Sequence, residues 1–407
     1  MDIEIRRAAD KEEAKRIMAV CELMFGYEAD EEELEGLSNI MPTERTFAAF
    51  DGPDIVGSAG NLDLELTVPG GEVSAAGVTI IAVLPTHRRR GLLRRLMAAL
   101  LEDAMAHGDP VAILWASESN IYQRFGYGYA TRQVWIEAKR DRFELLDQTP
   151  PKGKIRLVTK EEALRLFPAI YDAVRRASPG MLGRSEAGWK LRFRDPEKRR
   201  KGASPYFYAL HETDGVPSGY AVYNMKPDWD HSPKGKVMVT DLMSTSPDAT
   251  RDIWRFLFGI DLVETVETEL ILPDDHPLQL MVTEPRRLGT RVMEALWLRI
   301  LDVPGALEAR SYLGTGTIVL ELEDEMLAQN HGRWRIEAFD GRASVEKTSE
   351  SADARLHVKD LAATYLGAFS LCDLVAAGRA TELRCGAAED FDNMFRTLVS
   401  PYCPEIF

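Results

Sequence analysis

The feature that most constrains this chain is a repeat of its opening pattern about 150 residues further on. Ile3 and Ile5 alternate with charged residues, and Asp10 then stands three residues before Glu13, the spacing of a capped helix. The stretch 155–167 repeats this alternation and this cap with other residues. The repeat predicts two related domains, each opening with a strand and a helix. A chance similarity of two strand–helix openings is the alternative.

Two later pairs of segments support the duplication. Residues 219–223 resemble residues 55–59, and residues 237–242 resemble residues 78–83. In both copies the second of these strands runs into a proline and then into a helix. The copies differ at that junction, because the first copy has a glycine and several arginines there. The second copy has lost the glycine and most of the positive charge.

The chain divides into three predicted domains. A linker rich in Pro, Gly and Lys at 148–154 separates the two copies, and a third unit of alternating strands with flanking helices follows the second copy. We expect an α+β fold of mixed α/β layers, with domains at 1–150, 151–297 and 298–407. In the first copy the expected order is β-α-β-β-β-α-β-α-β, with its last strand at 133–138.

The charge balance excludes one class of partner. The chain has 50 Lys and Arg residues against 65 Asp and Glu residues, a formal net charge of -15. Nucleic acid is not expected as a partner, because phosphate binding needs a surplus of basic side chains. The acidic surplus favours a cationic substrate if it lines a cleft, since such walls focus the field on a cation. Solubility is the simpler explanation.

The cysteines and the apolar pattern indicate the compartment. Cys21, Cys372, Cys385 and Cys403 form no C-x-x-C pair and no metal spacing with the histidines, so no metal site is predicted. The sequence contains no run of about 18 apolar residues, so no membrane span is predicted. The first residues also lack the basic and apolar regions of a signal peptide. We expect a cytoplasmic protein.

The strongest local motif lies between a predicted strand and a predicted helix, at residues 83–94. Free backbone N–H groups in the turn, the positive end of the helix and the arginines would together form an anion site. The position of Gly91 fits neither a Walker A loop nor the G-x-G-x-x-G fingerprint. It fits the R-x-x-G-x turn that binds pyrophosphate in coenzyme A-dependent N-acetyltransferases. A solvated, basic helix start is the alternative.

The second motif, at residues 115–129, follows the next strand. Tyr122 lies on a short predicted helix beside that strand, where the thioester arm of the cofactor would run. A tyrosine, with an ordinary pKa of about 10, can protonate a departing thiolate. We therefore predict Tyr122 as a general acid, and we expect Tyr127 and Tyr129 to pack in the core.

These motifs resemble the Eis (enhanced intracellular survival) family of acetyl-CoA-dependent N-acetyltransferases. The resemblance implies an active N-terminal GCN5-related N-acetyltransferase (GNAT) domain, a degenerate middle GNAT domain and a C-terminal domain resembling sterol carrier protein. It spans nearly the whole chain in the family's order. The matching stretches are residues 82–94, 116–118, 121–128, 297–300, 303–304, 306–310 and 365–368.

The resemblance also implies roles for individual residues. The backbone of a short strand segment would bind the pantetheine arm, the turn and helix start would bind the pyrophosphate, and two residues after the next strand would lie along the cofactor. In that order, the implied residues are Ile81, Ala82 and Val83; Arg88, Arg89, Arg90, Gly91, Leu92, Leu93 and Arg94; and Ser117 and Glu118.

The family's general base is the terminal carboxylate, which here belongs to Phe407. A free α-carboxylate has a pKa of about 3.5 and is a weak base, although burial would raise that pKa. An electrostatic clamp on the incoming cation is an equally good role. The tail departs from the family pattern at Ile406, where some relatives carry an acidic residue.

The predicted function is acetyl transfer from acetyl-CoA, as co-substrate, to a primary amine. Attack on the thioester would be direct, because no Cys or Ser accompanies a plausible His base in these motifs. By resemblance the acceptor is an aminoglycoside or another small polyamine-like cation, and the assembly is a homohexamer. The alternatives are a protein lysine N-acetyltransferase and a non-catalytic protein that binds a lipid or another ligand through its C-terminal domain.

Overall fold

The computed structural model describes residues 3–28 and 30–407, so the first two residues of the predicted first domain lie outside it. The described chain forms two compact units. One unit comprises the chain up to Thr131 together with Leu296–Val399 and Ile406–Phe407. The other comprises Arg132–Ala295 and Ser400–Glu405. None of the described helices is long and apolar enough to cross a membrane.

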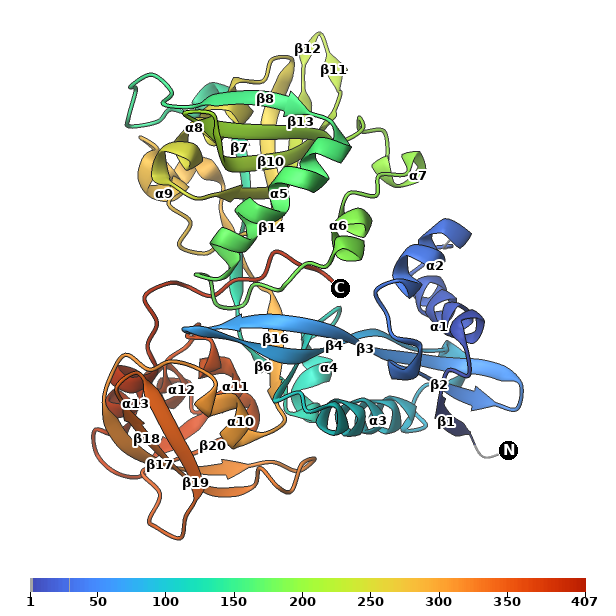
Figure 1. The fold of residues 1–407 in the computed structure, drawn as a ribbon, viewed down its shortest axis with the longest axis vertical. Helices are drawn as coiled ribbons and strands as arrows, with labels where there is room; N and C mark the ends of the chain where they lie inside the picture. The colour runs from blue at the N-terminus through green and yellow to red at the C-terminus, as the bar shows by residue number, and fades with distance from the viewer. Residues whose placement is uncertain (1–2, 29) are drawn as a thin grey trace. The chain divides into compact units, whose positions relative to one another are not determined.

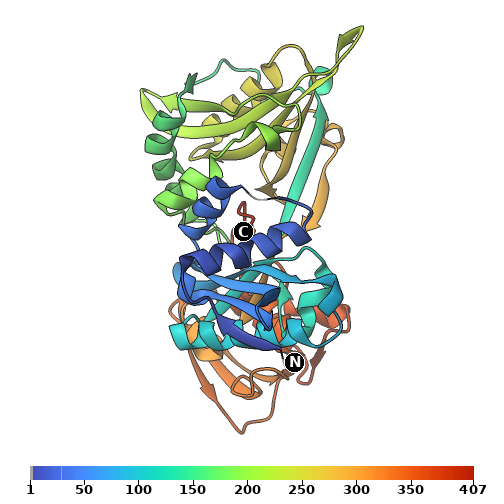
Figure 2. The ribbon, with the colours of Figure 1, turned by 90° about the vertical axis from the view of Figure 1, so that its right-hand side faces the viewer.

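The first unit contains a seven-stranded sheet. In spatial order its strands are β1 (Glu4–Arg7), β2 (Thr46–Asp51), β3 (Asp54–Val68), β4 (Gly71–Val83), β5 (Val111–Trp115), β16 (Leu296–Ile300) and β6 (Gly128–Tyr129). Only β4 and β5 run parallel. Helix α1 (Lys11–Met24) covers one face and α3 (Leu92–His107) covers the other (Figures 1 and 2).

Both helices follow the sequence pattern. Asp10 caps α1 by accepting a hydrogen bond from the Glu13 backbone, as its spacing predicts. The stripe of α3 that faces the sheet is fully buried, because apolar residues recur there every four positions. Two short helices complete this copy, α2 (Glu31–Ser38) and α4 (Ser119–Tyr122).

The sheet of the second unit repeats the first in the same spatial order. It runs β8 (Lys154–Val158), β9 (Phe207–Thr213), β10 (Val216–Lys226), β13 (Gly235–Ser244), β14 (Val263–Pro273), β7 (Arg132–Lys139) and β15 (Arg291–Glu294). The parallel pair is again the fourth and fifth strand. Its helices are α5 (Lys160–Arg175), α6 (Glu186–Arg192), α7 (Glu197–Arg200), α8 (Pro247–Gly259) and α9 (Leu278–Met281), and β11 (Trp229–Asp230) and β12 (Ser232–Pro233) form a small hairpin. The predicted duplication is therefore present in the fold.

The two copies exchange their sixth strands. β7 follows the first copy in the chain but pairs with β14 and β15 of the second sheet. β16 follows the second copy but pairs with β5 and β6 of the first sheet, where all its residues are buried. The structural divisions at 131/132 and 295/296 thus differ from the predicted boundaries at 150/151 and 297/298. A strand's pairing partner is a long-range property that its own residues do not reveal.

The C-terminal part of the first unit has its own five-stranded sheet, of order β19-β18-β17-β20-β21. Its elements are α10 (Val303–Glu308), β17 (Gly316–Glu323), β18 (Gly332–Phe339), β19 (Arg342–Lys347), β20 (Ala354–His357), α11 (Val358–Tyr365), α12 (Leu371–Ala376), β21 (Ala380–Glu382) and α13 (Ala387–Phe395). This is the α+β domain that the sequence predicts, with α12 and β21 added.

Candidate active site

The site begins where β4 and β5 separate. Their parallel ladder ends at Gly77 and Ile113, while β4 continues to Val83. The register between β3 and β4 shifts between Ser58 and Gly60, which places an extra residue in β4. Beyond Gly77, the ladder with β5 is absent from the described pairing, so that edge of β4 is open to an extended ligand.

A strained residue marks the bulge in β4. Ile80 has φ 49°, a left-handed value that is unusual for a β-branched side chain. The Ser58 hydroxyl donates a hydrogen bond to the Ile80 carbonyl at 2.7 Å and so holds the bulge. The segment that follows, Ile81–Val83, is the one to which the resemblance assigns the pantetheine arm. Strain of this kind is concentrated at functional sites.

The turn after β4 presents unpaired positive charge. Arg88, Arg89 and Arg90 are exposed, as is Arg94 in the first turn of α3. Within residues 3–28 and 30–407, the only hydrogen bond of these four side chains runs from Arg88 to the Val83 carbonyl, and none of the four is in an ion pair. In a chain with a surplus of carboxylates, such arginines indicate a site for an external anion.

Helix α3 starts without a side-chain cap. Gly91 occupies its N-cap position with φ 77°, a left-handed conformation that glycine adopts without strain. The first N–H groups of the helix therefore have no side-chain acceptor and point toward the arginine-rich turn. Together with the helix dipole they favour a phosphate-like ligand.

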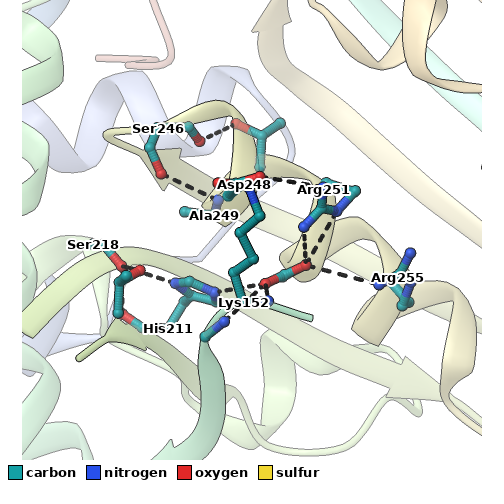
Figure 3. Close-up of polar contacts among 12 residues, drawn as sticks. Lys152, His211, Ser218, Ser246, Asp248, Ala249, Arg251 and Arg255 are labelled. Atoms are coloured by element: carbon teal, nitrogen blue, oxygen red, sulfur yellow. Dashed lines mark hydrogen bonds and ion pairs between the residues drawn. The ribbon is translucent and has the colours of Figure 1, made fainter. Parts of the chain in front are cut away.

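The corresponding helix start in the second copy is closed by its own side chains (Figure 3). Ser246 caps α8 by accepting a hydrogen bond from the Ala249 backbone at 3.2 Å. The Arg251 guanidinium pairs with Asp248 at 3.2 Å and with Asp252 at 3.3 Å. Among the described residues, the start of α8 therefore offers neither an uncapped helix terminus nor an unpaired Arg251, in agreement with the charge loss seen in the sequence of this copy.

A cavity of about 710 Å³ joins the open edge of β4 to the uncapped start of α3. It brings together the predicted residues Ile81, Ala82, Val83, Arg88, Arg89, Gly91, Leu92, Leu93, Arg94, Ser117, Glu118 and Tyr122. Its lining does not include Arg90 or Phe407. The residues that the sequence did not single out are Met24, Phe25, His87, Ile121, Arg124 and Phe125.

Tyr122 lies at the end of α4 and is 5% exposed. Burial raises the pKa of its phenol to about 12, although a hydrogen bond with the Ser117 side chain opposes the shift. The hydroxyl group therefore keeps its proton at neutral and moderately alkaline pH. It can donate that proton inside the cavity.

The glycine after Tyr122 has a packing role. Gly126 has φ 82°, and a Cβ there would lie 2.5 Å from the guanidinium of Arg299. Arg299 is fully buried and pairs with Asp324 at 2.6 Å. Tyr127 is also fully buried in this core, and Tyr129 stacks on Trp297 with ring centroids 5.8 Å apart. Both tyrosines pack as predicted.

The ring of Phe407 lies in the first unit, on the side of the sheet that α1 covers. It packs against a cluster that includes Met18, Met41 and Leu62. Ile80, the bulge residue of β4, packs against the same cluster. The terminal residue and the bulged strand thus share one apolar support.

Comparison with known proteins identifies the family. Models of the GNAT acetyltransferase domain match residues 4–130 and 180–300, and a model of the sterol carrier protein domain matches residues 303–404. The N-acetyltransferase Eis of Mycobacterium tuberculosis is 36% identical over 354 residues, 84% of each chain. This chain belongs to the Eis family of GCN5-related N-acetyltransferases.

Further relatives support this Eis-family assignment. A Streptomyces avermitilis protein described as an uncharacterized N-acetyltransferase is 40% identical over 382 residues, 92% of each chain. The crystal structure of Eis1 from Mycobacterium abscessus superposes with a TM-score of 0.85 at 30% identity, covering 99% of this chain and 100% of that one. The predicted family, fold class and N-acetyltransferase activity are confirmed, and the GNAT fold implies acetyl-CoA as the donor.

Proposed function

We propose that this Eis-family enzyme acetylates primary amines of a small cationic acceptor such as an aminoglycoside, with Tyr122 as general acid and the Phe407 carboxylate as base. The observation that carries the proposal is one cavity that joins the open edge of β4, the uncapped start of α3 and Tyr122. A non-catalytic scaffold would not need an anion site in one copy when the other copy has closed its own.

The donor would bind along these elements from its nucleotide to its thioester. The α3 N-terminus with Arg89 and Arg94 would bind the diphosphate, and the backbone of Ile81–Val83 would hold the pantetheine arm as an added strand would. Arg90 lies outside the cavity lining and would contribute only to the positive electrostatic field around the diphosphate. The thioester would then lie within reach of Tyr122.

The chemistry needs two proton transfers. The acceptor amine attacks the thioester carbonyl and passes a proton to the Phe407 carboxylate, or to a water that this carboxylate orients. When the carbon–sulfur bond breaks, Tyr122 donates its proton to the departing sulfur. A covalent enzyme intermediate is disfavoured at Cys21, because burial raises the pKa of this thiol to about 12 and leaves little thiolate.

A cationic acceptor is supported by the formal net charge of -15. The acidic residues of the α2 region, Glu28 and residues 30–33, do not line this cavity. Asp30 caps α2, and Glu31 pairs with Lys15 at 2.9 Å.

An amine panel tests the proposal. An aminoglycoside, spermidine and a lysine-containing peptide are each incubated with acetyl-CoA, and thiol release is followed. We expect the highest kcat/KM for the aminoglycoside or spermidine. Faster turnover of the peptide would favour a protein lysine acetyltransferase instead, and thiol release with none of the amines would reject this acceptor class.

We also propose that the enzyme assembles as a homohexamer, on the basis of the family resemblance. Light scattering coupled to size-exclusion chromatography measures the mass of the assembly. A mass that corresponds to six chains is expected, and a monomer or dimer would contradict the proposal.

A further inference from the structure

The C-terminal tail is built into the core of the second unit shortly before the chain ends. Tyr402 is 6% exposed and belongs to an aromatic cluster with Tyr171 and Trp189. Its backbone N–H donates a hydrogen bond to the Pro179 carbonyl at 3.0 Å. Cys403 is fully buried. Segment 400–405 is thus a packed part of this unit.

An arginine grips the last residue of that segment. The Nε of Arg184 donates a hydrogen bond to Oε1 of Glu405 at 2.5 Å. The Tyr171 hydroxyl, which donates to the Leu182 carbonyl at 2.7 Å, lies 3.2 Å from the same oxygen. On its other side, Nη1 of Arg184 donates to Oδ2 of Asp241 at 2.7 Å. The guanidinium also stacks over Tyr171, 3.9 Å from the ring centroid. Its position is fixed from several sides.

This ion cluster contains one more carboxylate than Arg184 needs. The Arg184 side chain is 3% exposed, and Asp241, at 1%, already balances its charge. Arg192 lies 3.7 Å from Asp241 but is partly solvated, with 23% of its side chain exposed. Removing Glu405 from water as well costs free energy. Packing of the tail alone would not require this cost. The contact does fix the course of the tail.

We propose that Arg184 is a positioning residue that acts through Glu405 on the terminal carboxylate, an inference that rests on the proposed role of Phe407. Only Ile406 separates the anchored Glu405 from Phe407. Two extended residues span about 7 Å, so the anchor confines the carboxylate to a small volume.

The test compares two carboxylates of nearly equal exposure. Glu405 is 16% exposed, and Glu267 of the same unit, which pairs with Lys236 and is remote in sequence from the tail, is 15% exposed. Glu405→Ala is the anchor variant and Glu267→Ala the matched control. Glu405→Gln, which keeps an acceptor oxygen, is a milder variant in case the alanine variant does not fold. Each is also made in a chain that carries one glycine after Phe407.

We expect Glu405→Ala to lower kcat about 10- to 100-fold, the size of effect known for a small misplacement of a catalytic group. The KM for acetyl-CoA should stay within about twofold of the original value. Carboxypeptidase should also remove Phe407 faster from this variant than from the unmodified enzyme. Glu405→Gln should have a smaller effect in the same direction, and Glu267→Ala should match the unmodified enzyme. In the glycine-extended chain, Glu405→Ala should cause no further loss.

The outcomes separate the two proposals. If the added glycine lowers kcat but both Glu405 variants leave kcat and Phe407 release unchanged, the anchor is rejected and the carboxylate role stands. An equal loss of kcat from Glu405→Ala with and without the glycine would also reject the anchor, because the residue would then act independently of the carboxylate. If the glycine itself leaves kcat unchanged, the base role of Phe407 falls, and the anchor falls with it.

Discussion

At the scale of single residues, access to the cavity distinguishes two neighbouring tyrosines that are both buried. Tyr122 and Tyr127 are close neighbours, with ring centroids 6.2 Å apart, and both are buried. The Tyr122 side chain lines the cavity, whereas the Tyr127 hydroxyl is enclosed without a hydrogen-bond partner among the described residues. The pair therefore offers a test in which one hydroxyl group is expected to matter and the other is not.

Tyr122→Phe should lower kcat by a factor of about 10² to 10⁴, the range for loss of a general acid, with little change in the KM for acetyl-CoA. Because the phenol has a pKa of about 12, it stays protonated below that pH, and no alkaline loss of rate from this group is expected up to about pH 10. Thiol release measured from pH 6 to 10 checks both points. Tyr127→Phe is the control, and equal rates for the two variants would remove the acid assignment.

A second residue-scale prediction concerns the stability of the second unit in acid. His276 is buried, accepts a hydrogen bond from the Leu278 backbone at 3.2 Å, and has a pKa lowered by burial to about 4. The unfolded chain binds this proton near pH 6.5, so stability is full above that pH and is lost as the pH falls toward 4. The loss amounts to about 3 kcal/mol.

Urea unfolding at pH 7.5 and pH 5 measures the part of that loss that occurs above pH 5, about 2 kcal/mol. His276→Asn, which keeps an acceptor atom for the Leu278 backbone, should lose less stability between the two pH values than the unmodified protein. An unchanged pH dependence in the variant would show that this histidine does not contribute to acid unfolding.

At the scale of elements, the two copies contain the same strand–helix junction with opposite electrostatics. Among the described residues, the α3 junction leaves its arginines without ion pairs and its first N–H groups without a side-chain cap, while the α8 junction pairs its arginine and caps its helix. Neighbouring residues on α3 provide a matched comparison. Arg94 lines the cavity, whereas Arg95 donates a hydrogen bond to the Ile3 carbonyl at 2.7 Å and does not line it.

Arg94→Ala should raise the KM for acetyl-CoA about 10- to 100-fold, the effect of one charge-assisted hydrogen bond to phosphate. Arg95→Ala also removes one positive charge, one residue further along the helix, and should raise the KM for acetyl-CoA no more than about threefold. Isothermal titration calorimetry with coenzyme A, at low and at high salt, measures the affinity of each variant for the nucleotide. Equal losses would mean that only the general field of the helix start matters.

The motifs of the site could be predicted from the sequence because they are local. Gly91 and its flanking arginines lie within one short segment, and Tyr122 lies in another. The bulge at Ile80 could not be predicted, since an isoleucine gives no local signal for a left-handed backbone. Met24 and Phe25 were missed for a similar reason. They line the cavity through the position of the end of α1, which only tertiary packing sets.

At the scale of the whole molecule, the exchanged strands explain why domain boundaries could not be read from the linker. The Pro/Gly/Lys segment at 148–154 separates the sequence copies, but the structural division follows the pairing of β7 and β16. The two related domains could be predicted from the repeat and the third from its strand pattern, and the family resemblance implied the type of each. The sheet to which β7 and β16 each belong could not be predicted, because it depends on contacts between segments more than a hundred residues apart.

A fragment that ends at residue 150 should therefore fail to fold. It lacks β16, which lies between β5 and β6 and is buried along its whole length, so the unpaired groups of both neighbours would be left exposed. Circular dichroism should show no cooperative melting, and coenzyme A should give no thermal shift. A fragment that melts cooperatively and is stabilised by coenzyme A would contradict this expectation.

The exchange of sixth strands has a consequence for the history of the gene. Once each half of the duplicated coding region supplied a structural part to the other half, neither half could be deleted or shuffled alone without leaving an incomplete sheet. The second copy is therefore needed for a complete chain of two sheets, even though its helix start is closed by its own side chains. Each of the two sheets is complete only when the other half of the chain is present.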